Sequence, residues 1–275
     1  MNPQRPLAGC VVGISISESE DLAGRHYDSH EVNRCVALLA ETLLGNGARL
    51  AFGHDWRPNG VMMAVADFAV RYAPSSPRSP GAMPAGEAPI LNLVAPPDRP
   101  FLHSGGDDDP VGQRLRGMLA GVVTARTIEF SPRTDDRRVA RADSLSALRV
   151  ELTRQCHARI CLGGRVGGFA GWFPGVAEEA HLALRSGQPL FTSAIFGGAA
   201  GAIATALVRR GPPPVWEPHA IIADTPLPPN LDFRDLRPAP NGLTPAEQTR
   251  LFDPPSPEAC IELILRGLVQ WWRRR

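Results

Sequence analysis

Residues 158–180 of this 275-residue chain read ARICLGGRVGGFAGWFPGVAEEA. The first five residues are mostly apolar, as in a short buried β-strand. Six glycines follow, and Glu178 and Glu179 then fall in the first turn of a helix expected over 175–185. Because glycine has no side chain, such a turn lets the backbone approach a ligand closely. This order of strand, glycine-rich turn and helix predicts a ligand-binding loop.

Apolar runs alternate with helix-like stretches on both sides of this segment. We expect further strands over 10–16, 48–53, 89–95, 122–130 and 189–196. We expect further helices over 61–73, 144–156 and 199–209, and one that begins at a Ser29 cap and ends at Gly45. Strands that alternate with helices of this length predict an α/β fold, a parallel sheet with helices on both faces.

Proline marks the segments that lack regular structure. Nine of the 28 prolines lie in 74–110 and thirteen in 212–257. Because proline is excluded from helix interiors and central strands, both stretches should be loops. We therefore expect one domain over 7–210, a proline-rich extended segment over 211–255 and a C-terminal helix over 256–275.

The C-terminal helix has a complete start signal. Ser256 is the expected N-cap, Pro257 occupies the first turn and Glu258 places a negative charge there. Its apolar stripe packs either on the domain or on a partner protein.

Composition restricts the chemistry of any site. All 29 basic residues are arginines, and the chain has no lysine. The absence of lysine excludes a Walker P-loop, a lysine Schiff base and a kinase-type lysine. Any bound phosphate must therefore contact arginine, backbone N–H groups or hydroxyls. The net charge of +1 argues against a nucleic-acid or membrane partner.

The five cysteines are odd in number and form no CxxC pair. We expect them to be reduced, buried thiols of a cytoplasmic protein. Residues 7–10 resemble a lipoprotein cleavage box, but no apolar stretch precedes them, so we expect no signal peptide. No apolar run approaches the roughly 20 residues of a membrane span.

Ligands of open parallel sheets bind beyond the carboxyl ends of the strands, where helix N-termini offer free N–H groups. The loops that follow four of the expected strands therefore supply the candidate ligand-binding residues. These are Ser15, Ser17, Gly53, Asp55, Arg57, Gly163, Gly164, Arg165, Gly175, Glu178, Gly197 and Gly198.

The first two of these loops carry polar side chains. The hydroxyls of Ser15 and Ser17 could hold a phosphate or a ribose, or could belong to a solvated turn. Asp55 could accept hydrogen bonds from ribose hydroxyls while Arg57 pairs with a phosphate. The alternative is an N-cap acid beside an exposed arginine.

The last two loops open helices. Acids in a first helical turn gain ~0.3–1 kcal/mol from the helix dipole, which alone could explain Glu178 and Glu179. Two carboxylates would nevertheless repel a bare phosphate, so they suit sugar hydroxyls or a developing oxocarbenium ion. Gly197 and Gly198 leave room for an anion at the next helix start.

Other patterns in the sequence are weaker evidence for a functional site. His26 and His30 have a spacing that one helix face could use for a metal, and Asp107–Asp109 form an acidic run, but neither completes a known motif. We predict no metal site and no cofactor. The glycine spacing is not G-x-G-x-x-G, which disfavours a dinucleotide oxidoreductase.

Taken together, three of these segments resemble the SLOG superfamily. They are the strand with Gly163-Gly164-Arg165, the Pro-Gly-Val-Ala-Glu-Glu-Ala of 174–180 and the Phe-Gly-Gly-Ala-Ala of 196–200. This Rossmann-like group includes the lonely-guy phosphoribohydrolases and nucleotide sensors of bacterial conflict systems. The segments VGISIS and RLAFGHDWRP are similar to a prokaryotic branch found alone or beside TIR-type effectors. The resemblance covers most of 7–210 and the last helix.

The resemblance implies a small-molecule nucleotide ligand. We also expect the protein to form a homo-oligomer. Whether it acts on a separate effector protein is left open by the sequence. Lonely-guy enzymes cut an N-glycosidic bond with a glutamate of a PGGxGTxxE loop and an upstream arginine. Glu179 falls on that glutamate, and Arg149 lies within one residue of that arginine. The Gly-Thr of the loop is replaced here by Gly175-Val176.

Two functions remain, beside a scaffold with a vestigial site. The first is a sensor that binds a nucleotide or an NAD-derived, ADP-ribose-like ligand. The second is a hydrolase with Glu179 and Arg149 as catalytic residues. Because the phosphate-holding Gly-Thr is missing, we favour the sensor.

Overall fold

The computed structural model describes residues 5–53, 65, 88–97, 121–221 and 225–275. They form a six-stranded sheet in the order β4-β3-β2-β1-β5-β6, in which every neighbouring pair is parallel. The strands are β1 Val11–Ser17, β2 Arg49–Gly53, β3 Ile90–Val94, β4 Val123–Thr127, β5 Ala158–Gly163 and β6 Leu190–Ser193. The predicted parallel α/β sheet is therefore confirmed.

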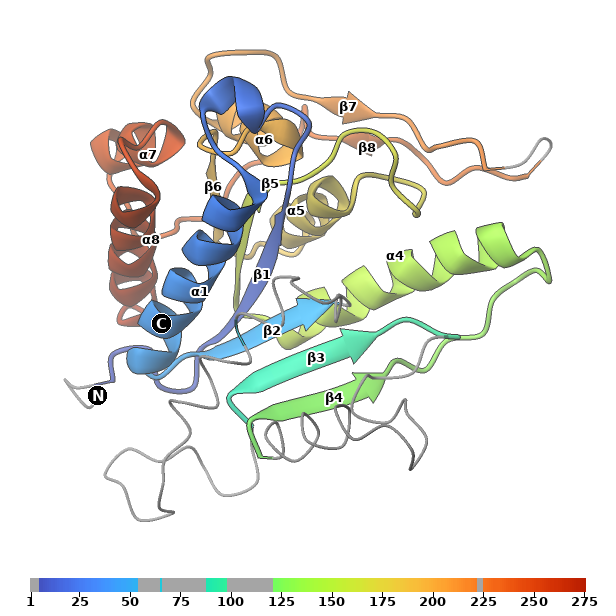
Figure 1. Cartoon of the computed structure of the whole chain (residues 1–275), viewed down its shortest axis with the longest axis horizontal. Coiled ribbons are helices and arrows are strands. Elements are labelled where there is room, and N and C mark those ends of the chain that lie inside the picture. The colour runs from blue at the N-terminus through green and yellow to red at the C-terminus, as the bar shows by residue number, and fades with distance from the viewer. Residues whose placement is uncertain (1–4, 54–64, 66–87, 98–120, 222–224) are drawn as a thin grey trace.

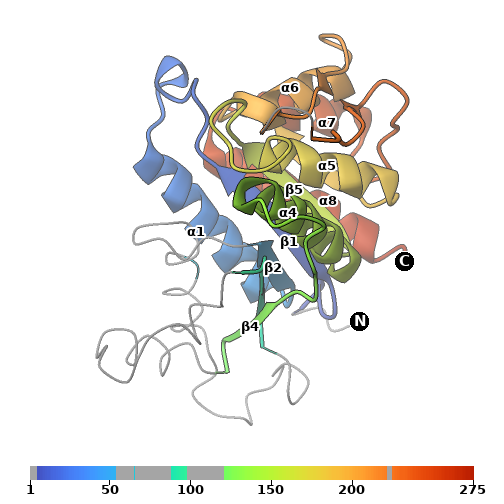
Figure 2. The ribbon, with the colours of Figure 1, turned by 90° about the vertical axis from the view of Figure 1, so that its right-hand side faces the viewer.

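Helices pack on both faces of the sheet (Figures 1 and 2). The α-helices whose bounds fall within the described residues are α1 Ser29–Gly45, α4 Arg137–Gln155, α5 Gly175–Arg185, α6 Gly198–Leu207, α7 Pro245–Phe252 and α8 Pro257–Trp272. Alternate residues of a strand point to opposite faces. On β5, Ile160 and Leu162 join the core with α1 and α8, whereas Cys161 joins the core with α5 and α6.

The C-terminal helix α8 packs on the sheet beside α1, as Figure 1 shows. Ser256 accepts a hydrogen bond from the Ala259 N–H, so the predicted cap is confirmed. Arg34 of α1 forms an ion pair of 3.1 Å with Glu258. Of the two positions left open by the sequence, this helix thus takes the one on its own chain.

Some element boundaries differ from the prediction. The N-cap of α1 is Asp28, whose side chain and that of Glu31 cap each other's backbone N–H groups, so the predicted cap at Ser29 is wrong. The helix α4 begins at Arg137, well before the predicted 144, because Asp136 caps it. The helix predicted over 61–73 lies, apart from its residue 65, outside the described residues.

The segment predicted to be extended after residue 210 contains regular structure. Two short strands, β7 Val215–Trp216 and β8 Leu231–Asp232, pair antiparallel. The helix α7 follows, with Thr244 and Glu247 capping each other's backbone N–H groups. A Thr-Pro start with an acid three residues after the cap is a helix signal, so this element was readable from the sequence.

All five cysteines are buried and free, as predicted. Burial raises the pKa of Cys10 and Cys161 to about 12 and that of Cys156 to about 11. These thiols therefore stay protonated at neutral pH, and a thiolate nucleophile is not available from them. None of the helices that the structure describes is long and apolar enough to cross a bilayer.

The order in which strands are added to the sheet reverses at β1. The chain runs from β1 through β2 and β3 to β4 on one side, then returns to place β5 on the other side of β1. Ligands of such sheets bind at the carboxyl ends of the two strands that flank this point. The relevant ends here are Ser17 and Gly163, which lie opposite each other in the register of β1 and β5.

Candidate functional site

Glycines bring three loops together at the carboxyl ends of β1 and β5. Gly163 and Gly164 have φ angles of +64° and +91°. A Cβ on Gly163 would lie 2.2 Å from the Ser17 carbonyl oxygen, and one on Gly164 would lie 2.6 Å from the Val176 side chain. The packing of the chain itself therefore requires glycine at both positions, and contact of either with a ligand stays a prediction.

The start of α6 closes on the same turn. The Ala199 N–H donates to the Gly164 carbonyl at 2.9 Å, and a Cβ on Gly198 would lie 2.1 Å from that oxygen. Gly197 and Gly198 both have positive φ angles, of +65° and +59°. Two of the predicted loops thus meet at one spot, where the N-terminus of α6 contacts the turn after β5.

Two acids of the loop after β1 lie at this spot, and the sequence analysis missed them. Glu20 accepts hydrogen bonds from the N–H groups of Val166 at 3.2 Å and Gly167 at 3.0 Å. Asp21 accepts one from the Gly198 N–H at 3.1 Å. Desolvation opposes the charged form of each carboxyl, but hydrogen bonds from backbone N–H groups lower both pKa values.

The first helical turn of α5 directs Glu178 into the protein. Its carboxylate accepts a hydrogen bond from Arg149 of α4, and the two side chains are only 8% and 11% exposed. The guanidinium lies against the glycine-rich loop, since a Cβ on Gly175 would come within 2.9 Å of it and one on Gly171 within 3.0 Å. Gly175 thus makes room for an arginine of the same chain.

Glu179 belongs to a second buried ion pair. Its Oε2 atom lies 2.8 Å from Nη1 of Arg159, a β5 residue whose side chain is fully buried. The Ser15 hydroxyl donates to the same carboxylate oxygen. A Cβ on Gly13 would lie 2.6 Å from the Arg159 guanidinium, so this glycine of β1 makes the space for it. Only the presence of a charged residue inside a buried strand pointed to Arg159 in the sequence.

The two residues proposed as catalytic are therefore not partners of each other. Arg149 pairs with Glu178, and Glu179 pairs with Arg159. The resemblance to lonely-guy enzymes placed Glu179 and Arg149 in one constellation, and the structure divides them between two neighbouring ion pairs.

The other predicted residues are scattered. Arg165 is exposed, and its guanidinium lies 3.9 Å from Glu18. Gly53 ends β2 and faces α4, where a Cβ would lie 3.3 Å from Leu148. Asp55 and Arg57 lie outside the described residues. Among the residues that the structure describes, no three His, Cys, Asp or Glu side chains are grouped to hold a metal ion.

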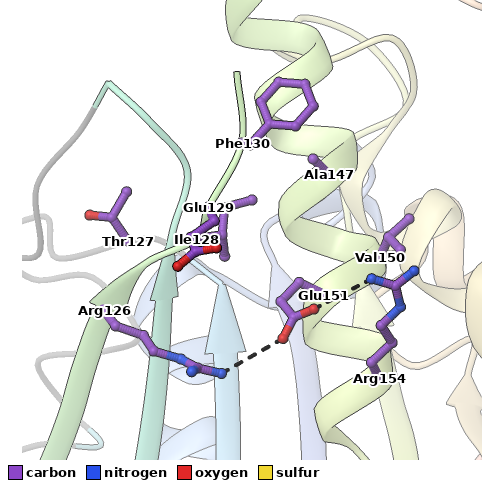
Figure 3. Close-up of a pocket in the computed structure, with 9 residues that line it drawn as sticks. All are labelled: Arg126, Thr127, Ile128, Glu129, Phe130, Ala147, Val150, Glu151 and Arg154. Atoms are coloured by element: carbon purple, nitrogen blue, oxygen red, sulfur yellow. Dashed lines mark ion pairs between the residues drawn. The ribbon is translucent and has the colours of Figure 1, made fainter. Parts of the chain in front are cut away.

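A groove of about 650 Å³ lies between β4 and the C-terminal half of α4 (Figure 3). Its lining combines apolar residues with four charged ones, Arg126, Glu129, Glu151 and Arg154. The guanidinium groups of Arg126 and Arg154 are each 3.7 Å from the Glu151 carboxylate. Because β4 is an edge strand three positions from β1, this groove is separate from the meeting point of the glycine loops.

A family model described as SLOG cluster2 matches residues 6–95 and 119–238. The match includes all six parallel strands, extends beyond 210 into the proline-rich segment, and does not include α8. No curated protein and no solved structure matches the chain. Since the two matched ranges make up most of the 275 residues, the chain belongs to the SLOG cluster2 family, a group of nucleotide-related α/β domains.

Proposed function

We propose that this protein is a nucleotide sensor, which binds a nucleotide or an NAD-derived, ADP-ribose-like ligand without cleaving it. The ligand would lie at the carboxyl ends of β1 and β5, where the strand order reverses. Membership of a nucleotide-related family supports the ligand class. Self-association and a separate effector protein stay predictions from the resemblance.

Backbone groups would provide most of the phosphate contacts. The N–H groups of Val166, Gly167 and Gly198 point to carboxylates in this structure, so they can donate to an anion. The N-terminus of α6 adds the positive end of a helix dipole. Arg165, whose side chain is 57% exposed, is the arginine of this loop that can reach a ligand.

The observation that favours binding over hydrolysis is the pairing of both glutamates. Removing one partner of a buried ion pair leaves an uncompensated charge, which costs roughly 3–5 kcal/mol. Glu179 would have to weaken its contacts with Arg159 and Ser15 in order to stabilise a ribosyl cation. The two arginines thus hold the glutamates in structural roles.

The alternative is a hydrolase that cleaves the N-glycosidic bond of a nucleotide. One observation favours it: the Glu179 side chain is 13% exposed, although its partner Arg159 is not exposed at all. A partly exposed carboxylate beside Ser15 of β1 could stabilise positive charge on a ribose.

Incubation of the pure protein with nucleoside monophosphates, NAD and ADP-ribose separates these functions. We expect the melting temperature to rise by several degrees with at least one of them, measured by differential scanning fluorimetry. We expect no free base by chromatography, because Glu179 is committed to Arg159.

Glu179→Gln tests whether this carboxylate is needed for any base release. Glu262→Gln, which changes an exposed acid of α8, is its control. Base release by the wild type that only Glu179→Gln abolishes would establish the hydrolase and end the sensor proposal. No shift with any ligand would contradict both and leave the scaffold.

A further inference from the structure

The loop between β1 and α1 lies against the proposed ligand site. We call residues 18–28 the β1 loop. The Ser19 hydroxyl donates to the Phe196 carbonyl, and the next two residues, Glu20 and Asp21, accept hydrogen bonds from the glycine-rich turn and from the start of α6. Three consecutive residues therefore attach this loop to the loops whose backbone N–H groups would bind the phosphates of a nucleotide.

Asp21 fits the start of α6 closely. A Cβ on Gly197 would lie 2.2 Å from Asp21 Oδ2 and 2.6 Å from Arg25 Nε, so any side chain at this position would collide with both. Arg25 also lies 3.6 Å from the Asp21 carboxylate. The Asp21 carboxylate thus fills the space that a side chain at Gly197 would occupy. This close packing is a second observation beside the hydrogen bond from the Gly198 N–H.

The same contacts can open. The side chains of Asp21 and Arg25 are 50% and 39% exposed, and Glu20 is also exposed. Solvent screens such interactions, so each is weak by itself. A ligand with higher charge could replace the carboxylates without breaking a buried ion pair.

We propose that Glu20 and Asp21 are an internal competitor for the ligand: their carboxylates occupy the N–H groups that would bind its phosphates, and the ligand displaces the β1 loop. This inference rests on the proposed function. It also narrows the ligand class, because two linked carboxylates occupy two neighbouring groups of N–H donors. A diphosphate carries two linked anionic groups in the same way, whereas a monophosphate carries only one.

The test is a calorimetric titration of the full chain with ADP-ribose, AMP and inorganic pyrophosphate. We expect Asp21→Asn to lower the Kd for ADP-ribose about tenfold and the double change with Glu20→Gln to lower it further. AMP should gain less. Glu262→Gln is the matched control: it removes the same charge from an exposed acid of α8 that pairs with Arg266 rather than with a backbone N–H of the proposed site.

An unchanged or weaker affinity of Asp21→Asn, or an equal gain from Glu262→Gln, would overturn the competitor while leaving the sensor intact. Absence of binding by the wild type and by every variant would overturn the sensor and the competitor together. Binding only after Asp21 is changed would support both.

Hydrogen–deuterium exchange of the wild type gives a second test that needs no variant. We expect ADP-ribose to increase deuterium uptake over 19–25, because the loop loses its contacts, and to decrease uptake at 166–167 and 198. Unchanged or reduced uptake over 19–25 in the presence of bound ligand would contradict displacement.

Discussion

Replacement of Arg159 by methionine is expected to lower the free energy of unfolding by roughly 3–5 kcal/mol, a large share of the roughly 5–15 kcal/mol typical of a folded protein. The side chain of Arg159 is fully buried, and that of its partner Glu179 is 13% exposed. Without the guanidinium, the Glu179 carboxylate would keep only the Ser15 hydroxyl as a hydrogen-bond partner in the part of the chain that the structure describes. Urea denaturation followed by circular dichroism measures the loss.

A double-mutant cycle separates the ion pair from the packing. We expect Arg159→Met with Glu179→Gln to recover a large part of the lost stability, since the second change removes the unpaired charge. Arg234→Met is the control, because Arg234 forms an exposed ion pair with Asp232 and should show no measurable change. If Arg159→Met and Arg234→Met were equally harmless, the buried pair would not stabilise the packing of α5 on β1 and β5.

The second large effect is expected at Gly163, where β5 ends. Gly163→Ala should cost roughly 2–5 kcal/mol, because the new methyl group adds a collision to the strain of a positive φ angle. The Cβ would lie only 2.2 Å from the Ser17 carbonyl oxygen, and backbone on both sides limits relaxation. Thermal or urea denaturation measures this cost.

Gly168 provides the matched control for this prediction. Its φ angle of +63° is nearly that of Gly163, but among the described residues no atom beyond its two chain neighbours lies within 4 Å of the position of its Cβ. Gly168→Ala should therefore show the conformational strain alone, roughly 1–2 kcal/mol. Equal losses for the two variants would mean that the collision at Gly163 is relieved by movement of the β1 end.

Several features could be predicted from the sequence because their signals are local. The apolar run of β5, the cap of α8 and the alternation of strands and helices are set by residues a few positions apart. The same kind of local signal is present at Thr244 and Glu247, although the surrounding prolines favour extended chain.

The candidate site was only partly predictable. Glu178 lies in the first turn of α5 as predicted, whereas Glu179 follows that turn. The two neighbouring side chains point in different directions, and each pairs with its own arginine. Glu20 and Asp21 carry no motif. Their contacts could not be read from nearby residues, since Asp21 accepts a hydrogen bond from a residue 177 positions away.

The sequence by itself determined the parallel α/β sheet and the family, because hydrophobic periodicity, capping residues and the spacing of a glycine-rich turn are written along the chain. Only the tertiary structure decided which charges meet. Each of these contacts joins residues from different elements: Arg149 with Glu178, Arg159 with Glu179, and Asp21 with the first residue of α6. Such contacts depend on the register of β1 against β5 and on the direction of each side chain, neither of which local sequence encodes.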